Sequence, residues 1–312
     1  PVCSPTRAAI MTGKYPARVD LTQYYYGDAR DKLVPPPYER ALPLEEVTIA
    51  EALKEAGYKT FIAGKWHIGL GEYFPEKQGF DTTKGVGFFS NPRFFSPYRN
   101  PRLPDGPDGE HLPDRLASET IAFLEGNRDK PFFVYFSMYS VHVPLVSRRD
   151  LRLKYQQKRQ REAPEDLWGK DGEYDVRLSQ NRAVYAGMVE AMDLAVGRVL
   201  DALDELGLSE NTVVIFTSDN GGLSTQKGPM PPTHGGATSN LPLRGGKGWI
   251  HEGGIRVPLM IKWPGVTSAG SVCDVPATST DFYPTLLDMA GAPLRPAQHR
   301  DGVSLVPLLK GE

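Results

Sequence analysis

Cysteine is scarce in this sequence, and long hydrophobic runs are absent. The 312 residues include two cysteines, Cys3 and Cys273, which lie near opposite ends of the chain. Two such distant thiols form no disulfide framework, so we expect both to stay unpaired. No apolar run reaches the roughly 18 residues that a membrane-spanning helix requires, and we therefore expect no membrane span.

Charge of neither sign is in large excess. Lys and Arg number 36 against 38 Asp and Glu, which gives a formal net charge of −2 and a pI near 6.4. A balanced chain creates no general basic field, so we expect no nucleic-acid partner, and any anion must bind at a local site. The 40% of hydrophobic residues, with 32 glycines and 28 prolines, describe a globular protein with many turns and substantial loops.

The hydrophobic pattern alternates between helix and strand signals. Thr48 and Glu51 form a predicted capping box at the start of a helical stretch, residues 52–56, that ends at Gly57. A strand over residues 59–63 should follow. Continuous apolar runs, which are typical of strands covered on both faces in a parallel sheet, occur at residues 132–136 and 212–216.

Later segments continue this alternation. Apolar residues at steps of three and four predict a helix from Tyr185 to Leu206. Residues 257–262 predict another strand, and residues 281–290 predict a helix that Gly291 closes. The order of elements predicts an α/β fold, a doubly wound and mostly parallel sheet flanked by helices. In such folds ligands bind at the carboxyl ends of the strands.

Two stretches interrupt the alternation and are too long for simple connections. Residues 85–115 are rich in Pro, Gly, Arg and aromatic residues, and residues 148–178 are rich in charge. We expect both to be loop or surface insertions within one domain, either functional lids or surface decoration. For the second stretch we expect a solvated helical face.

Polar side chains of catalytic types follow the predicted strands. Asp219 and Asn220 come directly after the run at 212–216 and before two glycines, so two oxygen ligands leave a strand end on flexible backbone. Carboxylate and amide oxygens suit a hard cation such as Ca²⁺ or Mg²⁺. The alternative interpretation is an Asx turn that only closes the strand.

Four further candidates carry positive or ionisable groups. Lys65 and His67 follow the strand at 59–63, and in extended backbone both would project to one side and grip one anion. His142 follows the run at 132–136, where a structural role is the alternative. Lys247 lies among glycines that permit close approach to a ligand, and its spacing differs from that of a P-loop, so we reject a nucleotide cradle.

The start of the chain carries the most specific motif. Residues 1–13 contain Cys3-Ser4-Pro5-Thr6-Arg7 and resemble the sulfatase signature built on Cys-x-Pro-x-Arg. Residues 57–67, GYKTFIAGKWH, resemble the second signature of that family. The resemblance continues through residues 218–222, 243–248 and 252–258. On these motifs the chain is identified as a member of the type I, formylglycine-dependent sulfatases, which are arylsulfatase-like and belong to the alkaline-phosphatase-like superfamily.

This resemblance implies a mechanism. A formylglycine-generating enzyme would oxidise Cys3 during maturation, and the hydrated aldehyde, a gem-diol, would attack sulfur. His67 would take the proton in the later elimination, and His142 or Lys247 would donate one to the leaving alcohol. The resemblance implies the following sets: catalytic Cys3, Arg7, Lys65, His67, His142 and Lys247; metal-binding Asp219, Asn220 and modified Cys3; substrate-binding Lys65, His142, Lys247 and His234. The implied cation is Ca²⁺, with Mg²⁺ as the alternative.

The resemblance also implies that this chain is a piece of a larger enzyme. Residues 1–312 would form the sulfatase catalytic domain of the alkaline-phosphatase-like fold without its first strand, which carries an acidic pair of metal ligands. The smaller C-terminal subdomain would be largely absent. We therefore expect this polypeptide alone to be a poor enzyme or inactive. An exported location is implied by the resemblance alone.

The sequence leaves the substrate open. We expect a sulfated carbohydrate or an aryl sulfate, and the long loops slightly favour a carbohydrate. One alternative is a phosphonate or phosphodiester hydrolase of the same superfamily. Another is a non-catalytic remnant that binds sulfated glycans through Arg7, Lys65 and Lys247.

Overall fold

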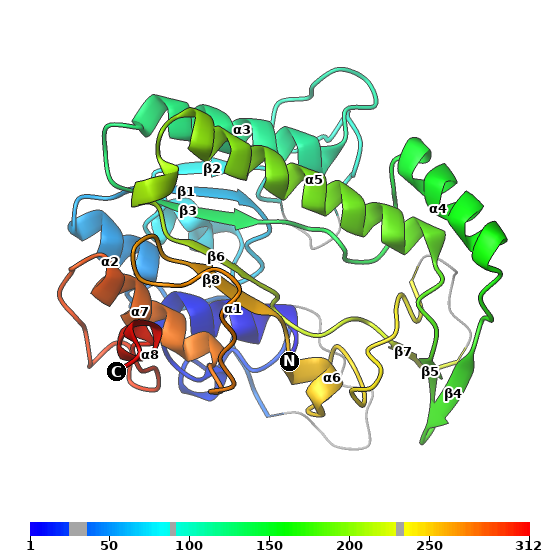
Figure 1. Ribbon diagram of the computed structural model, residues 1–312. Helices are drawn as coiled ribbons and strands as arrows, with labels where there is room; N and C mark the ends of the chain where they lie inside the picture. The colour runs from blue at the N-terminus through cyan, green and yellow to red at the C-terminus, as the bar shows by residue number, and fades with distance from the viewer. Residues whose placement is uncertain (25–35, 88–91, 229–233) are drawn as a thin grey trace.

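A small parallel sheet lies at the centre of the protein. The computed structural model describes residues 1–24, 36–87, 92–228 and 234–312. Strands β1 (Lys59–Gly64), β2 (Thr82–Lys84) and β3 (Phe132–Ser137) form this sheet in the order β2-β1-β3, and β1 is parallel to both neighbours. An antiparallel pair, β6 (Val214–Thr217) and β8 (Leu259–Lys262), lies next to β3 (Figure 1).

Helices cover both faces of these strands. One face carries α3 (Leu112–Asn127) and α5 (Ala183–Glu205), and the other carries α1 (Cys3–Thr12), α2 (Ile49–Glu55) and α7 (Phe282–Met289) (Figure 1). Strand β1 divides its side chains between two cores because successive residues point to opposite faces. Phe61 and Ala63 join the core that contains Leu116 of α3 and Met188 of α5, and Ile62 joins the core under the other helices. This layered arrangement confirms the predicted α/β class.

A second, antiparallel sheet lies away from the central one. It consists of β4 (Trp168–Asp171), β5 (Tyr174–Arg177) and β7 (Thr225–Gln226) in the order β4-β5-β7, and it lies beyond α6 (Glu252–Ile255) at the lower right of Figure 1. Helix α4 (Arg149–Glu162) packs on α5. The remaining elements are α8 (Val306–Lys310) and 3-10 turns at Pro16–Arg18, Gly71–Tyr73, Pro75–Lys77, Ser209–Asn211 and Ser279–Asp281.

Several local predictions are confirmed. The amide of Glu51 donates to the Thr48 hydroxyl at 3.2 Å, the Glu51 carboxylate accepts from the Thr48 amide at 2.7 Å, and α2 ends before Gly57, whose φ is +90°. The predicted helices at 185–206 and 281–290 correspond to α5 and α7. Both cysteines are unpaired, with Cys3 buried and Cys273 exposed. No described helix is long and apolar enough to cross a membrane.

The strands formed by the two continuous apolar runs differ in part from the prediction of a parallel sheet. β3 is parallel to β1 as predicted, but β6 is antiparallel to β8, and most side chains in β3 and β6 are half-buried. A run of apolar residues is typical of a strand with two covered faces, but it does not encode the direction of the neighbouring strand. Within the described ranges each of these strands pairs on one side only, which leaves its other edge more accessible.

The two interruptions differ in structure. Between residues 85 and 111 the described backbone forms only isolated bridges before α3 begins. Residues 148–178 form α4, β4 and β5, and most side chains of α4 are exposed, as predicted for a solvated helical face. α1 and α3 are helices that the sequence pattern did not predict.

Candidate active site

The candidate site lies where the carboxyl ends of three strands meet the start of α1. Lys65 follows β1 directly, Ser137 is the last residue of β3, and Asp219 comes two residues after β6. Cys3 is the first residue of α1. Parallel strand ends and a helix start therefore converge, as expected for the ligand-binding edge of an α/β fold.

Cys3 is surrounded by nitrogen-bearing side chains. The Lys65 Nζ is 2.9 Å from the Cys3 Sγ, and the Asn220 Oδ1 lies 3.8 Å from the same sulfur. His67 and His142 also form side-chain hydrogen bonds with Cys3. Cys3 and Lys65 are each only 3% exposed, so the Lys65 ammonium group is held away from solvent beside the sulfur.

The electrostatics of this cluster favour a negative charge at position 3. Burial raises the pKa of the Cys3 thiol, but hydrogen bonds from His142 and His67 and the charges of Lys65 and Lys247 lower the pKa well below its ordinary value. Burial also lowers the pKa of Lys65 and of His67, although Cys3 opposes both shifts. The His67 imidazole is therefore neutral near pH 7 and able to accept a proton.

Two histidines are oriented by local backbone geometry. His67 has a φ of +62°, a left-handed conformation that is strained for a non-glycine residue. The prediction of extended backbone at this point is therefore wrong, although both Lys65 and His67 reach Cys3. The Nδ1 of His142 lies 2.6 Å from the Val143 carbonyl oxygen. Because a carbonyl only accepts, Nδ1 carries the hydrogen, and Nε2 is the nitrogen left for other partners.

Arg7 connects the separate parts of the site. Its Nε and Nη2 lie 3.0 and 2.9 Å from the Asp219 Oδ2, and its Nη1 donates to the Lys65 carbonyl oxygen at 2.8 Å and to the Ser137 hydroxyl. Burial lowers the pKa of the guanidinium, but Asp219 raises it above its ordinary value. Arg7 is therefore a permanently charged, fixed group between the ends of β1, β3 and β6.

Ser137 is a site residue that the sequence analysis missed. Its hydroxyl accepts from Arg7 and donates to the Lys65 carbonyl oxygen at 2.7 Å, and its carbonyl accepts from the Lys65 amide at 2.6 Å. Gly64 permits this contact, because a β-carbon there would collide with the Ser137 carbonyl oxygen. The available signal was a polar residue that directly follows a predicted buried strand.

The loop that carries Lys247 is held against the site by its backbone. The Lys247 amide donates to Gly222 at 3.1 Å, and the Gly248 amide donates to the Pro1 carbonyl oxygen at 3.0 Å. Lys247 thus lies close enough for its charge to act on Cys3. His234 lies on a different segment, next to Gly235, whose carbonyl oxygen accepts a hydrogen bond from Arg182. The substrate-binding role of His234 stays a prediction.

The comparisons with known proteins identify the family. A family model described as Sulfatase matches residues 1–292. The chain belongs to the sulfatase family. It is 34% identical to a sulfatase of Formosa agariphila, over 99% of this chain and 63% of that protein, and 32% identical to human arylsulfatase A, over 99% and 59%.

Solved structures show the same fold for this sulfatase chain. Ps i-CgsB in complex with k-i-k-neocarrahexaose has a TM-score of 0.76 and 28% identity, and the match covers 99% of this chain and 66% of that one. PsFucS1 sulfatase from Pseudoalteromonas sp. has a TM-score of 0.70 and 26% identity, with 99% and 62% covered. The chain spans about three-fifths of the length of the two curated relatives named above.

The oxygen ligands that this sulfatase chain offers near Cys3 are of the type that a hard cation prefers, but they are few. Asp219 supplies a carboxylate and Asn220 an amide oxygen, and the Asn220 Nδ2 donates to Gly221 at 2.9 Å, which leaves Oδ1 facing Cys3. Ca²⁺ takes about 6 to 8 oxygen ligands. No group of three or more His, Cys, Asp or Glu residues in the described ranges could hold a metal ion. Asp219 and Asn220 therefore match a cation site in donor type, but these two residues alone do not complete one.

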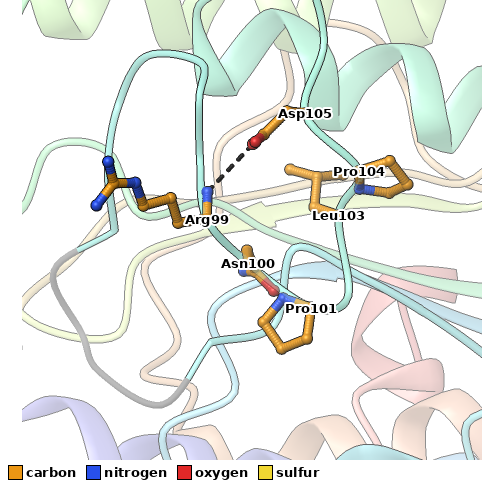
Figure 2. A pocket seen from close by; sticks show the side chains of 6 residues that line it. All are labelled: Arg99, Asn100, Pro101, Leu103, Pro104 and Asp105. Carbon is orange, nitrogen blue, oxygen red and sulfur yellow. Dashed lines mark hydrogen bonds between the residues drawn. The ribbon is translucent and has the colours of Figure 1, made fainter.

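A separate pocket occurs in the stretch between β2 and α3. Figure 2 shows it between Arg99 and Asp105, lined also by Asn100, Pro101, Leu103 and Pro104. The Arg99 amide donates to the Asp105 carboxylate at 3.1 Å, and the Arg99 guanidinium points away from the other lining residues (Figure 2). None of the residues around Cys3 lines this pocket.

Proposed function

We propose that the site around Cys3 hydrolyses a sulfate ester by cleaving its S–O bond, with a nucleophile made by oxidation of Cys3 to formylglycine. The observation that carries this proposal is the convergence of Lys65, His67 and His142 on the Cys3 sulfur, with Arg7 and Lys247 nearby. A buried cluster of cationic side chains stabilises an oxyanion that develops charge during reaction.

Each proton has a defined source or acceptor in this proposal. One hydroxyl of the formylglycine gem-diol gives its proton to solvent and forms a bond to sulfur while the S–O bond to the alcohol breaks. His142 or Lys247 donates a proton to the departing alcohol oxygen. His67 then removes the proton of the second hydroxyl, the carbonyl of formylglycine re-forms, and sulfate leaves with the bonding electron pair. Arg7, Lys65 and Lys247 neutralise the sulfate oxygens throughout.

A divalent cation, Ca²⁺ or Mg²⁺, would bind partly through Asp219 and Asn220. It would supply Lewis-acid stabilisation of negative charge at the nucleophile and the sulfate. Arg7 would keep the Asp219 carboxylate oriented toward it through the contacts at 2.9 and 3.0 Å. Residues 1–312 act in this proposal as the catalytic domain, with residues 85–115 and 148–178 as insertions.

The substrate in this proposal is a sulfated carbohydrate or an aryl sulfate. A related structure was solved with a neocarrahexaose, and relatives include arylsulfatase A and N-acetylgalactosamine-6-sulfatase. Selectivity in such folds resides in the loops above a shared core.

The test compares hydrolysis of an aryl sulfate with that of the matching aryl phosphonate. The whole protein that contains this chain is co-produced with a formylglycine-generating enzyme and supplied with Ca²⁺. We expect sulfate release to dominate, to stop on chelation, and to be nearly abolished in the Cys3→Ala, Asp219→Ala and Lys247→Ala variants. Cys273→Ala is the matched control, because that thiol is exposed and distant in sequence. Dominant phosphonate hydrolysis would establish the phosphonate alternative, and absence of both activities would favour the glycan-binding alternative.

A further inference from the structure

Three rings gather where the small antiparallel sheet meets the Lys247 loop. The rings of Tyr174 and Trp249 meet edge to face with centroids 5.1 Å apart, and Trp249 stacks on His251 at 6.0 Å. We call Tyr174, Trp249 and His251 the aromatic shelf. The shelf belongs to neither hydrophobic core of the molecule.

The shelf is rigidly connected on both sides. The indole Nε1 of Trp249 donates to the Thr225 hydroxyl of β7 at 3.2 Å. The Arg244 guanidinium forms two hydrogen bonds of 2.8 Å to the Asp171 carboxylate, which joins the loop to the end of β4. These contacts hold the indole at a defined angle, so its surface is preformed.

The shelf lies next to the candidate active site along the chain. Trp249 comes two residues after Lys247, so their Cα atoms are within about 7 Å of one another. The Gly248 amide between them is bound to the Pro1 carbonyl oxygen, two residues before Cys3. A ligand that extends from the Cys3 cluster past Lys247 would therefore reach the shelf.

The chemistry of the shelf fits a sugar ring with charged substituents. All three rings are half-buried and present part of their surface to solvent. Lys227 Nζ lies 5.8 Å from the centroid of Tyr174, and the Arg244 side chain is 63% exposed. Aromatic faces contact the C–H groups of a sugar, while guanidinium and ammonium groups bind sulfate oxygens.

We infer that the aromatic shelf binds a neighbouring sugar unit of a sulfated oligosaccharide whose reacting sulfate is held at Cys3. This inference rests on the proposed function and makes it more specific, because it assigns a polymeric rather than a small aryl substrate. Trp249 provides the apolar contact. Arg244 and Lys227, which are paired with Asp171 and Glu173, offer their remaining N–H groups to further sulfates of the same oligosaccharide.

The test measures binding directly, so it does not depend on turnover. Hexasaccharides of carrageenan, chondroitin sulfate and heparin are titrated into the whole protein and into its Trp249→Leu and Trp168→Leu variants by calorimetry. Trp168 is the matched control, since it is a 38% exposed tryptophan on β4, outside the shelf. We expect at least one hexasaccharide to bind, and Trp249→Leu to weaken that binding about tenfold or more while Trp168→Leu leaves it unchanged.

A measurement on the unaltered protein covers the case in which Trp249→Leu fails to fold. The indole N–H resonance of Trp249 should shift on titration with the bound hexasaccharide, and that of Trp168 should not. The inference is overturned if none of the three hexasaccharides binds with a Kd below about 1 mM. It is overturned as well if the Trp249→Leu variant binds with unchanged affinity and the Trp249 resonance does not shift. It is also overturned if Trp249→Leu reduces aryl sulfate turnover by the same factor as hexasaccharide binding. Failure of the proposed function is distinct, because formylglycine-containing protein would then release no sulfate at all.

Discussion

Arg7 and Ser137 together fix the relative positions of the strand ends in the site. The Arg7 guanidinium donates hydrogen bonds from one edge to Asp219 and from the other to the Lys65 carbonyl oxygen and the Ser137 hydroxyl. A buried arginine with all these partners has one orientation, and groups that orient a reactive cluster affect function strongly.

Ser137→Ala should lower kcat about 10- to 100-fold because Arg7 loses an acceptor and can rotate away from Asp219. Ser137→Thr keeps the hydroxyl and should recover most of the activity. The measurement is kcat and KM for an aryl sulfate, with the melting temperature as a check on folding. In an Arg7→Ala background the Ser137→Ala change should have little further effect. A full additional loss in that background would show that Ser137 acts independently of Arg7.

His111 makes stability depend on pH. It is 4% exposed, its ring is tilted against that of Phe95 with centroids 5.0 Å apart, and its Nδ1 is 3.8 Å from the Asp114 carboxylate. Burial lowers the pKa of His111 from 6.5 to about 4, against the smaller opposing effect of Asp114, while Arg148 lowers it and Asp150 raises it. The unfolded chain therefore binds a proton at a pH where the folded chain does not.

Because the pKa of His111 is lower in the folded state, its contribution is fully present above pH 6.5 and is lost as the pH falls toward 4. Protonation of the unfolded chain at this residue should remove about 2 kcal/mol of stability between about pH 7.5 and about pH 5. Urea unfolding at both pH values measures this. Over this pH range the His111→Gln variant should lose about 2 kcal/mol less stability than the unaltered protein. An equal loss of stability in both proteins would refute the assignment to His111.

The sequence predicted part of the site, and the reasons differ among residues. Asp219 and Asn220 could be found because they follow a predicted strand end. Cys3 and Arg7 rested on the resemblance, since no periodic pattern marks them. Ser137 was missed because its role depends on the register that places the end of β3 beside the end of β1.

Helix α2 owes its start to a single capping residue. The fully buried Thr48 hydroxyl accepts from the Glu51 amide and donates to the Gln78 carbonyl oxygen at 2.8 Å, so it ties the helix to the turn before β2. Both bonds are made by one hydroxyl, and an N-cap residue contributes about 1 kcal/mol.

Thr48→Ala should lower the free energy of unfolding by about 1 to 2 kcal/mol, since it removes the cap and leaves the Gln78 carbonyl oxygen without this partner. Thr48→Ser retains the hydroxyl and should lose less. Equilibrium unfolding in urea measures both variants. Equal losses would show that packing of the Thr48 methyl group, rather than hydrogen bonding, stabilises this helix start.

Elements were predicted well where local signals specify them. Caps and glycine stops located α2, α5 and α7, because these signals act within a few residues. The antiparallel pairing of β6 with β8 was not predicted, since it is decided by residues far apart in the chain. Helix α1 was not predicted, because its short motif of small and polar residues carries no clear apolar stripe.

At the scale of the whole molecule, two cores on opposite faces of β1 position the site. α1 brings Cys3 from one face, and the strands present Lys65 and Asp219 at their carboxyl ends. The layered fold was predictable from alternation alone. The small sheet β4-β5-β7 was not, because its strands are short, two of them lie within a segment rich in charge, and β7 joins them from a distant part of the chain.

The most direct test of the account compares turnover with the state of residue 3. The protein is produced with and without a formylglycine-generating enzyme, and mass spectrometry gives the fraction of residue 3 present as formylglycine. The rate of 4-nitrophenyl sulfate hydrolysis should be proportional to that fraction and nearly zero in Cys3→Ala. Equal turnover by protein that retains an unmodified Cys3 would contradict the central claim.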